Sequence, residues 1–485
     1  MMQTNTPLYT RLSKFQERKN ISFHVPGHKN GLLLSLKEWK ENLLSYDLTE
    51  LTELDDLHAP TDIILHAEEL LAELYGAKRS YFLVNGSTVG NLAMILGTAY
   101  EGQQVFVQRN SHKSIMNAIK LSKVKPILLN PQYDMEWEVP STISVDMLKR
   151  AIKLYPDVKV LILTSPNYYG MVGELAKLIQ LAHHNKIVVL VDEAHGAHFI
   201  GSNYFPISAV EAGADVVVQS AHKTLPALTM GSYLHFNSNL IEKERIEGYL
   251  SMLQSSSPSY PIMASLDIAR SYIATFNRKD EEYLRMQIFE FRKELNKIKQ
   301  IKVLEYKEGA GDPLKITIQS TCSLSGFSLQ KMLERQGIYT ELADAKNLLF
   351  VFPLLKSGMY YPIEEAIKRI KRVFEKLPND NHVLEDKGVS INIDTNIVEL
   401  KLSEGEQSLR KKKYVLFDEA ENGISAETVI PYPPGIPLLI PGEEITSNHI
   451  EQLKKLVQVG ANFQGDSSVY KRMLAIYTDK ESRRS

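Results

Sequence analysis

The stretch Asp215-Val-Val-Val-Gln-Ser-Ala-His-Lys223 guides the interpretation of the whole chain. It begins as a short apolar run of strand length and ends in the polar turn Ser-Ala-His-Lys. About thirty residues upstream, the apolar run Ile187 to Val191 ends in Asp192-Glu-Ala-His195. Two similar strands therefore end on a lysine and on a carboxylate. In parallel α/β sheets, ligands bind at the carboxyl ends of strands.

The region from 61 to 240 alternates between strand-like and helix-like segments. Further strands are predicted at Tyr81–Val84, Gln104–Gln108, Pro126–Leu129 and Val158–Leu163, and helices at Thr61–Tyr75, Val89–Tyr100, Lys113–Ser122, Val145–Leu154 and Leu175–His184. Such alternation is typical of parallel crossover units with helices on both faces of the sheet. Continuous Val/Ile/Leu runs fit strands that are buried on both faces. The sequence therefore predicts an α/β fold with a mainly parallel sheet.

The remaining segments predict smaller units. Residues 241–300 are helical in pattern, with a polar break at Ser255–Tyr260. Residues 301–378 indicate a smaller α/β unit, a linker is expected at Pro378–His382, and the last hundred residues include the proline-rich segment 431–442. The predicted domains are an N-terminal arm (1–60), a large domain (61–270), a small α/β domain (271–380) and a C-terminal domain (381–485).

Composition limits the possible partners. The net charge is -2, which gives no electrostatic reason to bind nucleic acid or an anionic membrane. No run reaches the ~18 apolar residues of a membrane-spanning helix, and the polar N-terminus has no signal-peptide pattern. Cys322, the single cysteine, is expected to be a half-buried apolar thiol in a reducing compartment. We expect a cytoplasmic protein that acts on a small molecule.

Four strand ends supply groups that complement Lys223. A lysine whose amine is neutral can hold an aldehyde cofactor as a Schiff base, and a carboxylate such as Asp192 can keep a heterocyclic ring nitrogen protonated. Asn85-Gly-Ser-Thr88 is equally consistent with a phosphate site or a plain helix cap. His112 suits either a helix cap or a ring that lies flat on a cofactor. Pro166-Asn-Tyr-Tyr-Gly170 could line the same crevice.

Two other interpretations of the histidine-rich motifs are disfavoured. The letters Asp192-Glu-Ala-His195 also occur in helicases, but those proteins need a P-loop, and the chain contains no G-x-x-x-x-G-K-[ST] stretch. A metal site built from His195, His198 and His222 does not match a zinc-ligand spacing. No metal is therefore expected.

Six motifs together resemble one family. They are Pro-Gly-His-Lys (26–29), Leu-Asp-Asp-Leu-His-Ala-Pro (54–60), Arg-Asn-Ser-His-Lys-Ser (109–114), Asp-Glu-Ala-His-Gly (192–196), Ser-Ala-His-Lys (220–223) and Tyr-Pro-Pro-Gly-Ile-Pro (432–437). Their order along the chain resembles that of the Orn/Lys/Arg decarboxylases, pyridoxal-phosphate enzymes of fold type I (aspartate aminotransferase-like). The large acid-inducible members begin with a response-regulator-like domain, so this chain is more similar to the short biosynthetic type.

The resemblance implies roles for individual residues. Lys223 would form the Schiff base, Asp192 would pair with the pyridinium nitrogen, and His112 would stack on the ring and, like Lys223, is a candidate proton donor. Ala194 would pack under the ring. The remaining cofactor-binding residues would be Gly86, Ser87, Thr88, His195, Ser220 and His222, with the hydroxyls and His222 around the phosphate.

The resemblance also implies an activity and an assembly. The reaction would convert arginine, lysine or ornithine into agmatine or a diamine plus carbon dioxide, for polyamine synthesis. The protein would be a homo-oligomer with its active site at a dimer interface, where Ser255–Ser257 would reach the neighbouring subunit's phosphate. The loop around Gly27 and the segment Pro431–Pro441 would shape the substrate entrance.

Three questions stay open from the sequence. An aminotransferase or carbon–carbon lyase of the same fold would use the same cofactor, and a catalytically silent regulatory homologue would keep the fold. The distal group of the substrate needs an acidic partner. Glu341, Asp344, Glu443 and Glu444 are candidates by charge alone.

Overall fold

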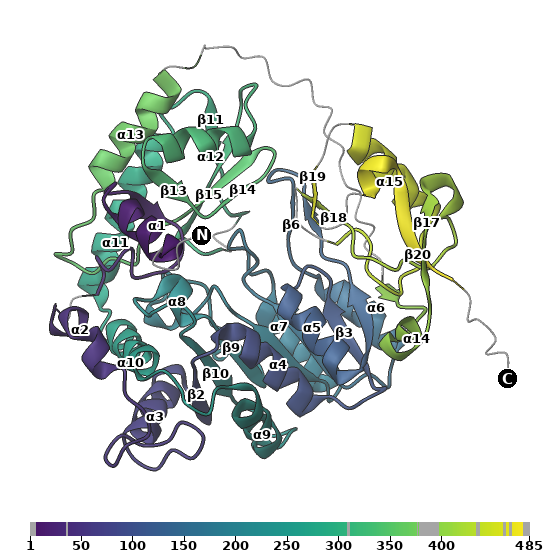
Figure 1. Ribbon diagram of the computed structural model, residues 1–485, viewed down its shortest axis with the longest axis horizontal. Coiled ribbons are helices and arrows are strands. Elements are labelled where there is room, and N and C mark those ends of the chain that lie inside the picture. The colour runs from purple at the N-terminus through teal and green to yellow at the C-terminus, as the bar shows by residue number, and fades with distance from the viewer. Residues whose placement is uncertain are drawn as a thin grey trace.

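The computed structural model describes residues 6–34, 37–307, 311–375, 377, 397–432, 437–458, 462–464 and 468–478. These residues form a large sheet covered by helices, a smaller sheet beside it, and a C-terminal unit on the other side (Figure 1).

The large sheet contains eight described strands in the order β16-β4-β3-β7-β8-β9-β10-β2. Their bounds are β2 Arg79–Leu83, β3 Gln104–Gln108, β4 Lys125–Leu129, β7 Val160–Thr164, β8 Val188–Asp192, β9 Val216–Gln219, β10 Ser232–Phe236 and β16 Ile397–Glu399. Strands β4, β3, β7, β8 and β9 run parallel, and β10 is antiparallel to both of its neighbours. The predicted mainly parallel α/β sheet is confirmed.

Successive residues of β8 belong to two different apolar cores. Val189 and Val191 contribute to one core, and Val188 and Leu190 to the other. This follows from the period of two in a strand, which sends neighbouring side chains to opposite faces. Helices α4 (Gly86–Thr98), α5 (Lys113–Ser122) and α9 (Lys243–Leu253) cover one face, and α3 (Ile63–Tyr75), α6 (Val145–Leu154), α7 (Leu175–His184) and α10 (Tyr260–Ala274) pack into the core on the other.

The smaller sheet is antiparallel, in the order β11-β12-β15-β14. Its strands are β11 Ile301–Val303, β12 Lys315–Ser320, β14 Leu342–Ala343 and β15 Asn347–Val351, with helices α11 Arg278–Leu295, α12 Gly326–Arg335 and α13 Ile363–Glu375. Its apolar residues continue the core that lies under the large sheet. The predicted boundary between residues 270 and 271 falls inside α10, and the domain limits remain predictions.

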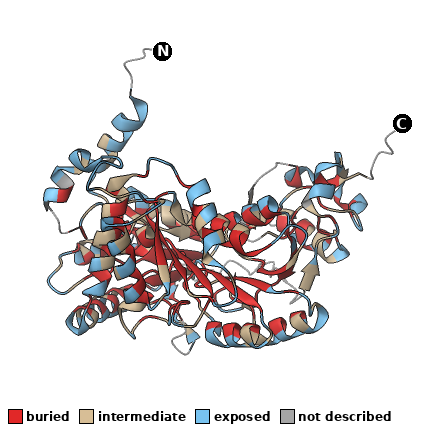
Figure 2. Ribbon diagram, turned by 90° about the horizontal axis from the view of Figure 1, so that it is seen from below, coloured by how far each residue is buried: buried red, intermediate tan, exposed pale blue. Residues whose placement is uncertain are grey.

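The N-terminal arm crosses to the smaller sheet. Strand β1 (Ile21–Phe23) pairs in parallel with β13 (Ile338–Thr340). Helix α1 (Pro7–Gln16) is largely exposed and stands away from the main body next to the N-terminus (Figure 2), and α2 (Lys37–Glu41) follows it. Apolar side chains on α1 face outward, with Leu8 75% and Leu12 56% exposed.

The C-terminal unit has its own apolar core, which includes Phe417, Leu453 and Leu474. Its elements are α14 Glu404–Ser408, β17 Lys412–Leu416, β18 Ile430–Tyr432, α15 Ser447–Gln458, β19 Asn462–Gln464 and β20 Met473–Tyr477. The expected linker at 378–382 and residues 433–436 of the proline-rich segment lie outside the described residues. Within the described ranges, no helix combines the length and apolar character needed to cross a membrane.

Candidate active site

The strand ends singled out in the sequence open into one cavity of about 1210 Å³. Its lining includes Ser87 after β2, His112 after β3, Tyr168 after β7, Asp192 at the end of β8, His195, and Lys223 after β9. All of these positions follow the carboxyl ends of their strands, where α/β sheets bind ligands. The structure thus brings these predicted residues together around one cavity, and their roles stay predictions.

Lys223 lies in the short helix α8 (Ala221–Thr224). Its Nζ is 3.2 Å from His195 Nε2 and 5.8 Å from the centre of the Tyr168 ring. Burial lowers the pKa of Lys223, although Asp192 and Glu341 oppose the shift. A lowered pKa raises the fraction of neutral amine, which is the nucleophilic form.

Asp192 is 2% exposed and lies beside this lysine. Its Oδ1 accepts a hydrogen bond from the Ala194 amide at 3.2 Å, and its Oδ2 accepts one from Asn91 Nδ2 at 3.0 Å. Burial raises the pKa of Asp192, and Lys223 and His112 act in the opposite direction. A buried carboxylate of this kind is stabilised by a positively charged ligand group placed next to it.

His112 is tied to Asp192 through two side chains. Asn91 Nδ2 also donates to Ser114 Oγ at 2.9 Å, and Ser114 Oγ lies 2.8 Å from His112 Nδ1. His112 is the N-cap of α5, with Nδ1 accepting from the Ser114 amide at 3.3 Å, and it also lines the cavity. The helix-cap interpretation is therefore confirmed, and stacking on a cofactor ring stays a prediction. Burial lowers the pKa of this imidazole.

Sequence reasoning missed Asn91 and Lys315. Asn91 is 1% exposed on α4, four residues after Ser87, so both side chains lie on one face of the helix. An asparagine at this spacing in an otherwise apolar helix was the available signal. Lys315 is 0% exposed on β12, and its Nζ lies 3.0 Å from His195 Nδ1. A lysine at the start of the apolar run Leu314-Lys-Ile-Thr-Ile318 was the corresponding signal.

The loop between β2 and α4 has the features of an anion site. Gly86 adopts φ +79°, a conformation that favours glycine. The first amides of α4 have no partner within the helix and point toward its N-terminus. Ser220 Oγ donates to Ser87 Oγ at 2.7 Å, which places two predicted phosphate ligands together. Thr88 follows on the exposed side of the same turn.

His222 is placed differently from the other predicted phosphate ligands. Its Nδ1 faces the Gly231 carbonyl at 2.9 Å, so Nδ1 carries the proton of the neutral ring. Burial lowers the pKa of His222 to about 4. The opposite nitrogen can donate to a phosphate only when the ring is cationic, a state that a bound anion would favour.

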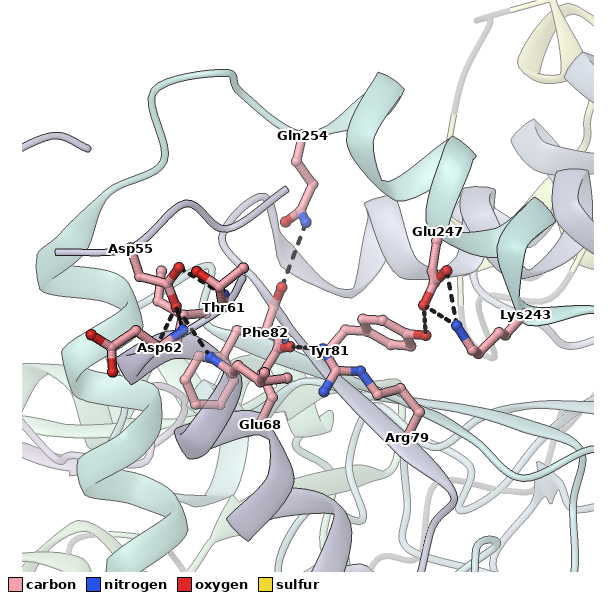
Figure 3. Close-up of polar contacts among 12 residues, drawn as sticks. Asp55, Thr61, Asp62, Glu68, Arg79, Tyr81, Phe82, Lys243, Glu247 and Gln254 are labelled. Atoms are coloured by element: carbon pink, nitrogen blue, oxygen red, sulfur yellow. Dashed lines mark hydrogen bonds and ion pairs between the residues drawn. The ribbon is translucent and has the colours of Figure 1, made fainter. Parts of the chain in front are cut away.

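A set of polar contacts holds the end of β2 in place (Figure 3). Glu68 Oε1 accepts from the Phe82 amide at 2.9 Å, and its Oε2 pairs with Arg79 at 2.7 Å. Gln254 Oε1 accepts from the Val84 amide at 2.8 Å. Next to them, Asp55 accepts from the amides at the start of α3. The strand that leads into the Gly86 loop is therefore fixed by side chains from two other segments, Glu68 on α3 and Gln254 after α9.

The Gly27 loop packs directly on the turn that carries Lys223. The Gly27 amide donates to the His222 carbonyl at 2.6 Å. A Cβ on Gly27 would lie 2.4 Å from Leu225 O and 2.5 Å from Thr224 C. Only glycine fits there, because backbone atoms cannot move aside as a flexible side chain can. The loop supports α8, and its expected part in a substrate entrance stays a proposal.

The four acidic residues that were candidates for binding the distal substrate group differ in their positions and partners. Glu341 lines the cavity. Glu443 was a wrong candidate, because it is 1% exposed and both of its oxygens bind Arg109, at 2.9 and 2.7 Å. Asp344 is buried and bound to Tyr169 and Asn347. Glu444 is not among the residues that line the cavity, and it pairs with Lys401, which is, at 3.3 Å.

The residues present fit pyridoxal phosphate. The amine, the buried carboxylate and the imidazole face one cavity, and the helix terminus with Ser87 lies at its edge. They match the aldehyde, the ring nitrogen, the ring face and the phosphate of that cofactor. Among the described residues, no three His, Cys, Asp or Glu side chains gather as a metal-binding group.

Comparison with known proteins identifies the family of this chain. Residues 6–310 match the family model "Orn/Lys/Arg decarboxylase, major domain", and residues 399–468 match its C-terminal domain. The uncharacterized protein YaaO of Bacillus subtilis is 45% identical over 98% of this chain and 99% of that protein. The arginine decarboxylase of Bacillus subtilis is 34% identical over 99% of this chain and 100% of that protein.

A solved structure shows a similar fold. The lysine decarboxylase LdcF of Francisella novicida superposes with a TM-score of 0.74 at 21% identity, covering 97% of this chain and 80% of that one. The chain thus belongs to the Orn/Lys/Arg decarboxylase family, whose members are pyridoxal-phosphate-dependent lyases that decarboxylate basic amino acids.

Proposed function

We propose that this protein decarboxylates arginine to agmatine, with Lys223, Asp192 and His112 as its catalytic residues. The observation that carries the proposal is the convergence of these three side chains, from three strand ends, on one cavity. Arginine is preferred to lysine and ornithine because relatives named as arginine decarboxylases align over nearly the whole chain. The agmatine produced would serve as a precursor for polyamine synthesis.

Bound pyridoxal phosphate supplies an electron-withdrawing ring that takes up the electrons of the breaking carbon–carboxylate bond. Asp192 would keep the ring nitrogen protonated, and Asn91 holds the Asp192 carboxylate in place. His112 would contact the face of the ring. The lowered pKa of Lys223 provides a neutral amine that can take up a proton and return it to the α-carbon.

The proposed partner of the distal guanidinium group is Glu341. It lines the cavity together with Lys223 and Tyr168, and among the described residues its Oε2 accepts only a backbone hydrogen bond, from Val25 at 2.9 Å. The neighbouring Lys29 is buried, and burial lowers its pKa to about 7. Because Lys29 is then partly neutral, it leaves the Glu341 carboxylate available to a cationic substrate.

We further propose a homo-oligomer whose active site is completed at a dimer interface. Ser255–Ser257 are exposed, and the Ser255 amide donates to Asn85 at 3.3 Å, next to the proposed phosphate site. The exposed apolar side chains of α1 provide surface for a second copy of the chain. Light scattering gives the subunit number, and mixing two differently inactivated variants tests whether they restore each other's activity.

Replacement of Lys223 tests the assignment most directly. Lys223→Ala should lower carbon dioxide release from arginine about 1,000-fold or more, because the nucleophile is removed. Borohydride reduction should attach the cofactor to the wild-type chain and leave the variant unlabelled. Lys177→Ala, at an exposed lysine paired with Glu174, is the control. Normal turnover of Lys223→Ala, or a keto acid in place of carbon dioxide, would reject the proposal.

Replacement of Glu341 tests the substrate assignment. Glu341→Gln keeps the acceptor for the Val25 amide and removes the charge, so KM for arginine should rise about 10- to 100-fold. Glu399→Gln is a matched control. Glu399 also lines the cavity, but it binds Tyr155 and Gln104, and Gln104 lies at the start of β3, the end opposite to His112. An unchanged KM in Glu341→Gln would assign the distal group to another residue.

A further inference from the structure

Two buried side chains, Lys315 and His195, form a continuous line from the smaller sheet to the half-buried Lys223. Lys315 Nζ lies 3.0 Å from His195 Nδ1, and His195 Nε2 lies 3.2 Å from Lys223 Nζ. Lys315 is 0% exposed and His195 is 4% exposed. The proposed reaction leaves Lys315 without a role, although burying a lysine is costly unless it is compensated.

The chemistry of imidazole restricts which of the three side chains can be protonated. Burial and the two neighbouring lysines hold the pKa of His195 well below its usual range, so the ring is neutral. A neutral ring has one donor nitrogen and one acceptor nitrogen, whereas an ammonium group can only donate. The ring N–H can donate only to a neutral amine, so both contacts are hydrogen bonds only when the lysine that faces it is neutral, while the other lysine donates and can do so as an ammonium group.

Charges on the far side favour the ammonium form at Lys315. Burial lowers the pKa of Lys315, while Glu341 and Asp312 both oppose that shift. Asp312 is 0% exposed, and its Oδ2 has no hydrogen-bond partner among the described residues. Asp192, the carboxylate nearest Lys223, is already bound by Asn91 and the Ala194 amide.

We propose that Lys315 is a positioning residue that holds His195 as its Nε2–H tautomer and thereby keeps Lys223 a neutral amine. Lys315 donates to Nδ1, Nε2–H then donates to Lys223, and Lys223 accepts through its lone pair. The inference rests on the proposed function only for the role of Lys223. The titratable groups that face Lys223 are Asp192, His112, Tyr168, His195, His222, Glu341 and, through His195, Lys315.

The test is the pH dependence of Lys223 acylation in the full-length chain stripped of cofactor. Acetic anhydride modifies only the neutral amine, and mass spectrometry of the Lys223 peptide follows the extent. Lys315→Met removes both the charge and the donor, so Nε2 can accept from a Lys223 ammonium group. The labelling midpoint, which is the pH at which the acylation rate of Lys223 is half of its maximum, should rise by about one pH unit or more. At a pH below the midpoint, such a shift corresponds to about a tenfold loss of neutral amine.

Two further variants separate this role from a structural one. Lys315→Gln lacks the charge but can still donate to His195 Nδ1, so its midpoint should rise less than that of Lys315→Met. Lys29→Met removes another buried lysine, one bound to the carbonyls of His24 and Val351, and should leave the midpoint unchanged.

Three results of these labelling experiments would decide whether Lys315 acts on Lys223. A wild-type midpoint in both folded Lys315 variants, or an equal shift in Lys29→Met, would overturn the proposal. Should Lys315→Met fail to fold, a wild-type midpoint in Lys315→Gln would overturn it as well. Because acylation needs no substrate, a midpoint shift without carbon dioxide release would refute the proposed function and leave this inference standing.

Discussion

At the scale of single residues, Asn91 links two of the proposed catalytic side chains. Its amide donates to Asp192 Oδ2 at 3.0 Å and to Ser114 Oγ at 2.9 Å, and Ser114 contacts His112. One side chain therefore fixes both the carboxylate and the imidazole at the cavity. No pattern in the strands reveals this link, because Asn91 lies on a helix.

Asn91→Ala is expected to lower kcat/KM about 10- to 100-fold. The reason is the loss of a hydrogen bond to a charged group, about 1.5–3 kcal/mol, and the freedom gained by His112. Steady-state assays of carbon dioxide release measure the effect. Asn296→Ala, at an exposed position after α11, is the matched control. Wild-type kinetics in Asn91→Ala would show that Asp192 and His112 keep their positions without it.

At the scale of elements, the turn α8 depends on a loop from the other end of the chain. Gly27 lies against the backbone of Thr224 and Leu225, directly after Lys223. The position of the catalytic lysine therefore depends on the N-terminal arm, which also pairs with β13.

Gly27→Ala should destabilise the protein by about 1–3 kcal/mol, because the new methyl group collides with backbone atoms. It should also slow attachment of the cofactor to Lys223, since α8 must shift. Chemical denaturation and borohydride trapping measure the two effects. Gly248→Ala is the control: Gly248 lies inside α9 with no atom within 4 Å of an added Cβ. That change should stabilise the protein by up to about 1 kcal/mol. Equal behaviour of the two variants would contradict the packing argument.

Elements were predictable to different degrees. The bounds of α5, α6, α7, β3 and β9 agree with the sequence patterns. Strand β10 was missed, because Ser232-Tyr-Leu-His-Phe236 mixes polar and aromatic residues and its polar groups bind other core polar groups. Strand β16 was missed because its partner β4 lies more than 250 residues away in the chain.

At the scale of the whole molecule, a buried ion pair joins the large sheet to the C-terminal unit. Arg109 follows β3 and binds Glu443 through two nitrogens, and it also donates to the carbonyls of Pro437 and Leu438. The side chains of Arg109 and Glu443 are 5% and 2% exposed. The contact places the proline-rich segment next to the cavity, which Pro437, Ile440 and Pro441 help to line.

Arg109→Ala should destabilise the protein by about 3–5 kcal/mol, because it leaves Glu443 buried without a partner. Replacing both residues by apolar ones should recover most of that loss. Denaturation curves and protease cleavage of the C-terminal unit measure the effect. Arg278→Ala is the control, since its pair with Glu282 is 90% and 62% exposed and contributes about 0–1 kcal/mol. A loss in Arg109→Ala no larger than in this control would contradict the docking role.

The sequence by itself determined the α/β class, most helices and strands of the large sheet, and the strand ends that carry Lys223, Asp192 and His112. These features depend on local periodicity and on the rule that parallel strands present their carboxyl ends at one edge. Only the tertiary structure decided that Asn91 holds Asp192, that Lys315 reaches His195, and that Glu443 is occupied by Arg109 and not by substrate. Those contacts join segments far apart in the chain, and burial, which sets the pKa values of Lys223 and Asp192, exists only once the chain has folded.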